Sequence, residues 1–230
     1  NALVRADALN RRLQTLAANL DRLWVVCATA PPPKPGLIDR YLVAAHAQGI
    51  KAGVIFNKYD LVGDEESAED VEDLLLPYEI LELPALKVSA EVGFGIDELK
   101  EALKGERSVF VGHSGVGKTS LLNALIPELN ETVGELSDAT GKGQHTTTSS
   151  TLYPLAGGGE IIDSPGIRGF GLWKMPSREL KDHFPEFLEF SPQCRFHNCL
   201  HLEEPECAVR DAVDADELSI DRYEAYIRIY

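Results

Sequence analysis

The chain has 230 residues, 44% of them hydrophobic, and a formal net charge of −15 at pH 7. This length accommodates one globular domain with a small additional module, and no apolar run reaches the roughly 18 residues of a membrane span. The acidic balance argues against a general nucleic-acid-binding surface, so contact with RNA would need a local basic patch or a segment outside this sequence.

The ends of the sequence and its cysteines indicate its context. The first residue is Asn1 and the only methionine is Met175, so we expect a piece of a longer protein. We find no secretory signal, which favours a cytoplasmic location. In such a chain, clustered cysteines favour a metal site over disulfide bonds.

Short β-rich runs alternate with amphipathic segments between residues 23 and 163. We expect strands at residues 24–27, 52–56, 86–88, 108–111, 151–155 and 160–162, and helices at residues 38–48, 67–76, 96–103 and 118–125. This alternation predicts an α/β fold with a mainly parallel sheet and flanking helices. Residues 168–230 have few strand signals and are predicted to form a separate, mostly helical module.

A glycine-rich loop stands between an expected strand and an expected helix. It consists of Gly112, His113, Ser114, Gly115, Val116, Gly117, Lys118, Thr119 and Ser120. The sequence matches the phosphate-loop pattern at every fixed position. Glycines let backbone N–H groups surround phosphates, Lys118 would contact the β- and γ-phosphates, and the Thr119 hydroxyl would bind Mg²⁺. A nucleotide site is therefore predicted here.

A second motif selects the base, and it follows the expected strand at residues 52–56. Its residues are Asn57, Lys58, Tyr59 and Asp60. The Asp60 carboxylate can accept hydrogen bonds from guanine N1–H and the 2-amino group, which adenine does not offer. Asn57 and the Lys58 stem would support the loop and cover the base. Ser89 and Ala90 follow the next strand, where a backbone N–H would meet guanine O6.

Two segments after the phosphate loop have the features of nucleotide switches. Asp163 follows a strand and would hold Mg²⁺ through water, and the Gly166 N–H would contact the γ-phosphate. Residues 141–148 are polar and glycine-rich, and one threonine there would complete the Mg²⁺ shell. We favour Thr147 over Thr146 for this role. A flexible loop with no ligand role is the alternative.

The order of these motifs is unusual. Base recognition precedes the phosphate loop and the switches follow it, whereas in the common order the phosphate loop comes first. The pattern predicts a circularly permuted P-loop GTPase domain. A compact sheet domain tolerates such permutation because its natural ends lie close in space.

Three of the 4 cysteines lie close together with a histidine among them. The cluster consists of Cys194, Cys199, His201 and Cys207. Three thiolates and one imidazole satisfy tetrahedral Zn²⁺ and leave no open position, so a structural zinc site is predicted. Unliganded buried cysteines are the alternative. We expect Cys27 to be a small core residue, and His183 and His197 to be surface histidines.

The chain resembles the RsgA family, also called YjeQ or YloQ. The permuted order carries the resemblance, together with the cysteine cluster and a loop of the form GxGxHTT. That loop contains Gly141, Gly143, His145, Thr146 and Thr147. The segment at residues 37–42 also looks like the first helix of the family. The resemblance covers nearly the whole chain, and the cysteine spacing matches the zinc module of the family.

The resemblance implies a bacterial GTPase stimulated by the small (30S) ribosomal subunit, acting in late maturation of that subunit with rRNA binding. It implies a remnant of an N-terminal OB-fold domain at residues 1–18, a GTPase domain at residues 19–167 and a zinc module at residues 168–230. We expect a monomer whose partners are GTP or GDP and the small subunit with its rRNA, and no membrane.

The catalytic group is less evident from the residues. Ile167 stands where many GTPases carry a glutamine that orients the attacking water. His145, the histidine of the family loop, is the candidate to position water once the subunit orders the loop, and Lys118 would stabilise the phosphates. A histidine that only orders the loop or contacts RNA is the alternative.

Two other functions compete with a GTPase. A nucleotide-gated RNA-binding adaptor would bind GTP and hydrolyse it only incidentally, which fits the hydrophobic Ile167. A P-loop ATPase with a fortuitous NKxD motif is the third reading. Turnover with and without small subunits, and competition between GTP and ATP, would separate these functions.

Overall fold

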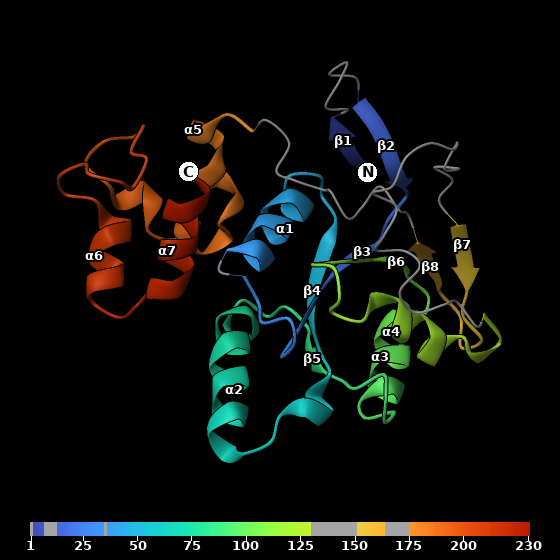
Figure 1. The fold of residues 1–230 in the computed structure, drawn as a ribbon. Helices are drawn as coiled ribbons and strands as arrows, with labels where there is room; N and C mark the ends of the chain where they lie inside the picture. Colours follow the sequence, from blue (N-terminus) through green and yellow to red (C-terminus); the bar gives the residue numbers. More distant parts are fainter. Residues whose placement is uncertain (1, 7–12, 35, 130–150, 164–174) are drawn as a thin grey trace, which may run out of the picture.

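The computed structural model describes residues 2–6, 13–34, 36–129, 151–163 and 175–230. Figure 1 shows a central sheet with helices on both faces. A helical C-terminal module lies beside one of these faces. Within the described residues, no helix is both long and apolar enough to span a membrane.

A six-stranded sheet forms the centre of the chain, in the order β5-β4-β3-β6-β8-β7. Its strands are β3 (Arg22–Ala28), β4 (Lys51–Asn57), β5 (Ala85–Lys87), β6 (Arg107–Val111), β7 (Thr151–Pro154) and β8 (Glu160–Asp163). All neighbours are parallel except β7 and β8. The predicted α/β fold with a mainly parallel sheet is thus confirmed, because each expected strand is present.

A separate antiparallel pair precedes the sheet. It consists of β1 (Ala2–Ala6) and β2 (Leu13–Ala18). Neither strand was among those expected from the sequence, which predicted only a remnant of another domain at residues 1–18. Strand pairing between segments is decided by the register of two chains, which a single sequence window does not display.

Helices cover both faces of the sheet (Figure 1). One face carries α1 (Leu37–His46) and α2 (Glu65–Ile80), and the other carries α3 (Ile96–Leu103) and α4 (Lys118–Leu125). Side chains of β3 alternate between two apolar cores, with Leu23 and Val25 in one and Trp24 and Val26 in the other. A strand buried on both faces therefore reads as continuously apolar.

Helix α2 is longer than its sequence predicts. We expected it to end at residue 76, and the next residue, Pro77, lacks the N–H of a helical hydrogen bond. The helix continues to Ile80 with Pro77 inside it. Val71, Leu75 and Tyr78 are buried on one face of α2, and this packing outweighs the local preference.

The C-terminal module consists of short helices around an aromatic core. Its elements are α5 (Ser177–Leu180), η4 (Lys181–His183), η5 (Pro185–Leu188), η6 (Ser191–Gln193), α6 (Ala208–Asp214) and α7 (Ile220–Ile229). Phe184, Phe187 and Tyr226 are fully buried and contact one another edge-on or stacked. Val43 of α1 belongs to the same apolar cluster, so the module packs directly against the sheet domain.

Two histidines meet across this contact. His46 Nδ1 of α1 lies 3.0 Å from His183 Nδ1 of η4, with the rings at 69°. His183 is half-buried, so the expectation of a simple surface histidine was incomplete, whereas His197 is exposed as expected. Burial, and then the charge of His46, lower the pKa of His183, while Asp182 and Glu179 act in the opposite direction.

Replacing His46 should therefore raise the pKa of His183. In His46→Gln the charge of His46 is gone but burial remains, so the pKa of His183 should rise and stay below about 6.5. In the unchanged chain the lowered pKa should make the free energy of unfolding fall as pH drops below about 6.5, because the unfolded chain takes up the proton more readily. An NMR titration of the ring protons measures the pKa, with His197→Gln as control. An unmoved His183 pKa in His46→Gln would contradict the contact.

Candidate nucleotide site and metal cluster

The carboxyl ends of the parallel strands gather the predicted motif residues at one edge of the sheet. Strands β4 and β5 lie on one side of β3, whereas β6 and β8 lie on its other side. The chain thus reverses its direction of winding between β3 and β6, and ligands of open α/β sheets bind outside the carboxyl ends of strands at such a point. The loop at residues 112–117 follows β6 directly at this reversal.

The side chain of Asn57 joins the base motif to the phosphate loop. Its Nδ2 donates to the Val116 carbonyl oxygen at 2.9 Å and lies 3.5 Å from that of Gly117. Its Oδ1 accepts from the Ala90 N–H at 3.2 Å. Asn57 is 1% exposed, so its amide has little access to water. Three segments that are distant in the sequence are therefore held together by one amide.

Two loop glycines stand where no other residue fits. A Cβ on Gly112 would lie 2.1 Å from the Val26 carbonyl oxygen, and one on Gly117 would lie 2.3 Å from Asn57 Nδ2. Both have left-handed backbone angles, with φ of 140° and 91°. Glycine at these positions lets the loop pack against β3 and the base motif.

Lys118 lies at the start of α4 with its ammonium group over the loop. Its Nζ donates to the carbonyl oxygens of Gly112 at 2.9 Å and His113 at 2.8 Å. The positive charge is thus held within the curve of the loop. Thr119 and Ser120 follow in the first turn of α4 and are half-buried.

Asp60 and Ser89 face each other at the base-recognition end. The Ser89 hydroxyl donates to Asp60 Oδ1, and Ser89 itself is fully buried. Asp60 is exposed, so its carboxylate is accessible from solvent. Tyr59 stacks on Phe94 with ring centroids 5.4 Å apart, which connects the base motif to the loop after Ser89.

Lys58 reaches the loop that follows β3. Its Nζ donates to the Ala30 carbonyl oxygen at 2.5 Å, and its Cε would lie 3.8 Å from a Cβ on Gly117. The lysine stem therefore runs beside the phosphate loop, which is the position a cover over a bound base requires.

The predicted Mg²⁺ ligands are only partly described. Asp163 ends β8, two strands from β3 on the same edge of the sheet as the phosphate loop. Thr147 and its alternative Thr146 lie outside the described residues, as do the predicted γ-phosphate contact Gly166, the candidate His145, and Ile167. The roles of all these residues stay predictions.

The four residues of the cysteine cluster converge within the C-terminal module. Their ligand atoms all lie within 4.8 Å of one another. His201 Nδ1 is 3.7 Å from Cys194 Sγ and 3.4 Å from Cys207 Sγ, and the two sulfurs are 4.0 Å apart. Atoms bonded at about 2.3 Å to a tetrahedral ion would lie about 3.8 Å apart. The cluster therefore has the donors and the size to hold one metal ion.

The surroundings orient these ligands. The other ring nitrogen of His201 lies 3.1 Å from the Ser191 hydroxyl, the kind of outer contact that fixes a metal-binding imidazole. Burial raises the pKa of Cys199 to about 12 and lowers that of His201 to about 4. Burial thus keeps the imidazole neutral, as ligation requires, and a divalent cation would favour the thiolates. Cys27, by contrast, is buried in the sheet core, which confirms the expectation.

A protein-family comparison decides the broader class. The profile of the RsgA GTPase family matches residues 1–173. The chain belongs to the RsgA GTPase family. A relative from Azotobacter vinelandii, named small ribosomal subunit biogenesis GTPase RsgA, is 47% identical over 227 residues, 99% of this chain and 66% of its own length. A relative of the same name from Flavobacterium psychrophilum is 42% identical, and the match covers 100% of this chain and 71% of the relative's own length.

Two solved structures of the family have the same fold. YjeQ from Thermotoga maritima is 36% identical with a TM-score of 0.79, over 100% of this chain and 76% of that one. YloQ, described as a circularly permuted GTPase, is 25% identical with a TM-score of 0.72. The match covers 99% of this chain and 77% of that one. The predicted permuted GTPase fold is confirmed. This chain spans about two thirds of the length of several of the curated relatives it matches.

Sequence reasoning missed several residues that shape the site. Phe94 and Ser191 contact predicted site residues, but nothing in their local sequence distinguishes them from other loop residues. Arg222 forms ion pairs with Glu186 and with Asp39 of α1, which lies 183 residues away in the sequence. Only the folded chain brings these groups together.

Removing the Asn57 amide should destabilise the site measurably. In Asn57→Ala the buried Val116 carbonyl and the Ala90 N–H lose their partner, so the free energy of unfolding should fall by about 1–3 kcal/mol. Urea denaturation measures it. In Asn57→Asp the acceptor for Ala90 remains and the donor to Val116 is lost, which separates the two halves of the contact. A change in Asn57→Ala within about 0.5 kcal/mol, as for an ordinary surface residue, would contradict the assigned role.

Proposed function

We propose that this chain binds GTP at residues 112–120 and hydrolyses it when stimulated by the small (30S) ribosomal subunit, during late maturation of that subunit with rRNA binding. The observation that carries the proposal is the Asn57 amide, which holds the phosphate loop and the base-reading segments in one site. Membership in the RsgA GTPase family and the printed names of the relatives support the same function.

At the base, Asp60 accepts hydrogen bonds from guanine N1–H and the 2-amino group. The Ser89 hydroxyl orients this carboxylate by donating to Oδ1. The Ala90 segment would supply a backbone N–H for guanine O6, and the Ala90 N–H would then exchange its contact with Asn57 Oδ1 for the base oxygen. Lys58 runs beside the phosphate loop and covers one face of the base, while Tyr59 braces the loop by stacking on Phe94.

At the phosphates, the backbone N–H groups of residues 112–117 surround the β-phosphate. Lys118 exchanges its contacts with the loop carbonyls for the β- and γ-phosphates. Mg²⁺, when bound, neutralises charge on these phosphates. Thr119 would hold it directly and Asp163 through water, with Thr147 from the first switch. Gly166 would contact the γ-phosphate.

For hydrolysis we infer that His145 positions the attacking water once the subunit orders its loop, because Ile167 cannot hydrogen-bond to water. The chain is proposed to act as a monomer in the cytoplasm. A nucleotide-gated RNA-binding adaptor is the second candidate, favoured by the same hydrophobic Ile167. The domain bounds at residues 18/19 and 167/168, and an OB-fold origin for residues 1–18, stay predictions.

GTP turnover measured against small-subunit concentration tests this function. Turnover by the chain alone should be slow and should rise with added subunits. His145→Ala should lose about 10²-fold or more of the stimulated rate, the usual contribution of one general acid–base group. Stimulated turnover equal to wild type in His145→Ala would refute its role, and tight GTP binding without any stimulated turnover would favour the adaptor.

Asp60→Asn is the control for base recognition in the same assay. An amide in place of the carboxylate should weaken GTP binding and shift preference toward xanthosine triphosphate. The amide NH₂ can donate to the 2-oxo group of xanthine but cannot accept from the 2-amino group of guanine, while the amide oxygen still accepts from N1–H. Lys118→Ala should abolish nucleotide binding. Undiminished GTP preference in Asp60→Asn would count against the proposed base site.

We further propose that the metal ion held by the cysteine cluster is a structural Zn²⁺. Three thiolates and one imidazole are the donor set that zinc prefers, and all four positions come from the protein. The ligand loop is also braced from outside, because Tyr223 and Tyr226 of α7 donate to the His201 and Leu200 carbonyl oxygens at 2.7 Å and 2.5 Å. The ion would join η6, the loop after it and the start of α6.

Loss of one ligand should release the ion and loosen the C-terminal module. In Cys207→Ser the zinc content should fall from about one ion per chain to near zero, because a hydroxyl is a poor zinc ligand. Metal analysis and limited proteolysis of residues 175–230 measure both effects. Cys27→Ala, which alters a cysteine outside the cluster, should retain the zinc. Full zinc content in Cys207→Ser would overturn the assignment.

A further inference from the structure

Helix α1 belongs to two apolar cores at once. Ile38 and Leu42 pack in the core between α1 and the sheet. Val43 faces the opposite way, into the aromatic core of the C-terminal module, and is fully buried there. Because packed interiors resist displacement, the position of α1 depends on both bodies.

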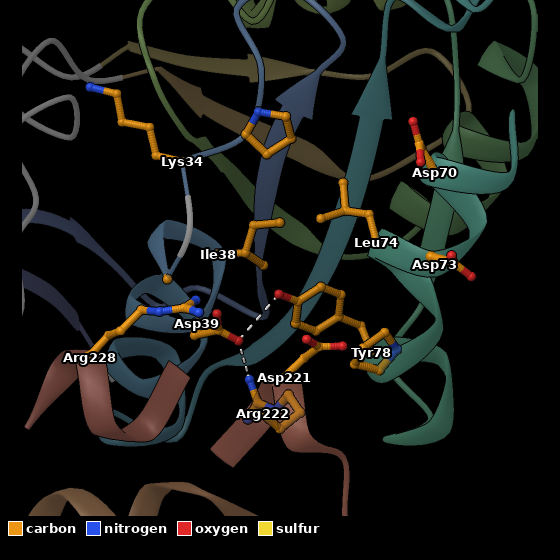
Figure 2. A pocket seen from close by; sticks show the side chains of 13 residues that line it. Lys34, Ile38, Asp39, Asp70, Asp73, Leu74, Tyr78, Asp221, Arg222 and Arg228 are labelled. Atoms are coloured by element: carbon orange, nitrogen blue, oxygen red, sulfur yellow. Dashed lines mark hydrogen bonds and ion pairs between the residues drawn. The ribbon is translucent and has the colours of Figure 1, made fainter. Parts of the chain in front are cut away.

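A buried ion cluster connects the first turn of α1 to the C-terminal module. Arg222 of α7 donates to Asp39 Oδ1 through Nη1 and to Glu186 Oε1 through Nε at 2.6 Å. The Tyr78 hydroxyl of α2 donates to the same Asp39 oxygen at 3.3 Å. The side chains of Arg222 and Asp39 are only 4% and 7% exposed. Figure 2 shows Asp39, Tyr78 and Arg222 meeting among the side chains that line a cavity between α1, α2 and α7.

Disrupting this ion cluster should strongly destabilise the folded chain. Removing one partner from a buried ion pair leaves an uncompensated charge, which destabilises far more strongly than losing an exposed pair. The guanidinium also lies over the Phe184 ring, 4.8 Å from its centroid. Asp39 is therefore held in one place by groups from α2 and α7, and Glu186 of η5 in turn holds Arg222.

Two residues after Asp39, the side chain of Tyr41 lies at the start of the phosphate loop. Tyr41 is buried in the same apolar core as Val111, the residue before Gly112. The Gly112 backbone N–H is oriented to donate to its phenol oxygen. Burial raises the pKa of Tyr41, and this hydrogen bond partly opposes the rise. Gly112 is the first residue of the loop and is itself closely packed on Val26. A continuous set of contacts thus runs from Arg222 to Gly112.

We propose that Tyr41 is a positioning residue for the phosphate loop. Through α1, the ion pair of Arg222 and Asp39 that anchors the C-terminal module also raises the affinity of the loop for a nucleotide. The inference rests on the proposed nucleotide site. A loop already held in its phosphate-binding conformation loses less conformational freedom on binding, so anything that loosens α1 weakens nucleotide binding from a distance.

Tyr41→Phe tests the contact with the least disturbance, because it removes one hydroxyl from a residue that stays buried. The affinity for GDP, measured by titration calorimetry on the full chain, should fall by about 2- to 12-fold, the range of one hydrogen bond. Tyr230→Phe, which removes a hydroxyl from an exposed tyrosine, should leave the affinity unchanged. Unchanged affinity in Tyr41→Phe overturns the positioning role.

A double-variant cycle tests the transmission. Arg222→Lys keeps the charge but loses the forked geometry, and it should weaken GDP binding although Arg222 lies in the C-terminal module. The same change should have a smaller effect in the Tyr41→Phe background, since the link is already broken there. Arg195→Lys, in an exposed ion pair of the same module, is the matched control.

The outcomes separate this inference from the proposed function. If the unchanged chain binds neither GDP nor GTP, the nucleotide site itself is wrong. If it binds, and Arg222→Lys lowers the melting temperature without changing GDP affinity, the cluster is only structural and the transmission is refuted. Additive effects of Arg222→Lys and Tyr41→Phe would refute the route through Tyr41. A smaller effect in the Tyr41→Phe background supports it.

Discussion

The carboxamide of Asn57 is the interaction on which the nucleotide site depends. It hydrogen-bonds to Val116, 59 positions later in the sequence, and to Ala90, 33 positions later, and it is buried away from water. A buried amide with both ends satisfied holds its neighbours in one arrangement, because each alternative leaves a polar group without a partner. The circular permutation has little effect on this contact, because the carboxyl ends of the strands lie close together in space whatever their order in the sequence.

Around that contact, packing decides how much the loop can move. Gly112 and Gly117 allow the loop to approach β3 and the Asn57 amide more closely than any side chain would permit. On the other side, α1 holds the loop through Tyr41 and is itself held by the C-terminal module. In our proposal the module is thus connected to the nucleotide site through α1.

The cysteine cluster and the aromatic core of the module support each other. Residues 175–230 have only short helices and turns, which bury little apolar surface for their length. Phe184, Phe187 and Tyr226 supply one part of the missing stability, and a metal ion at the cluster would supply another. Tyr226 connects the two, since its ring lies in the core and its hydroxyl donates to the ligand loop.

The sequence by itself determined the strands and helices of the sheet domain, the phosphate loop, the base motif, the metal-ligand set and the family. These features depend on local spacing, which a linear pattern displays in full. Tertiary structure alone decided the β1–β2 pairing, the extension of α2 through Pro77 and the ion cluster of Arg222 and Asp39. Each of these depends on groups far apart in the chain, whose meeting is set by packing and burial rather than by any local pattern.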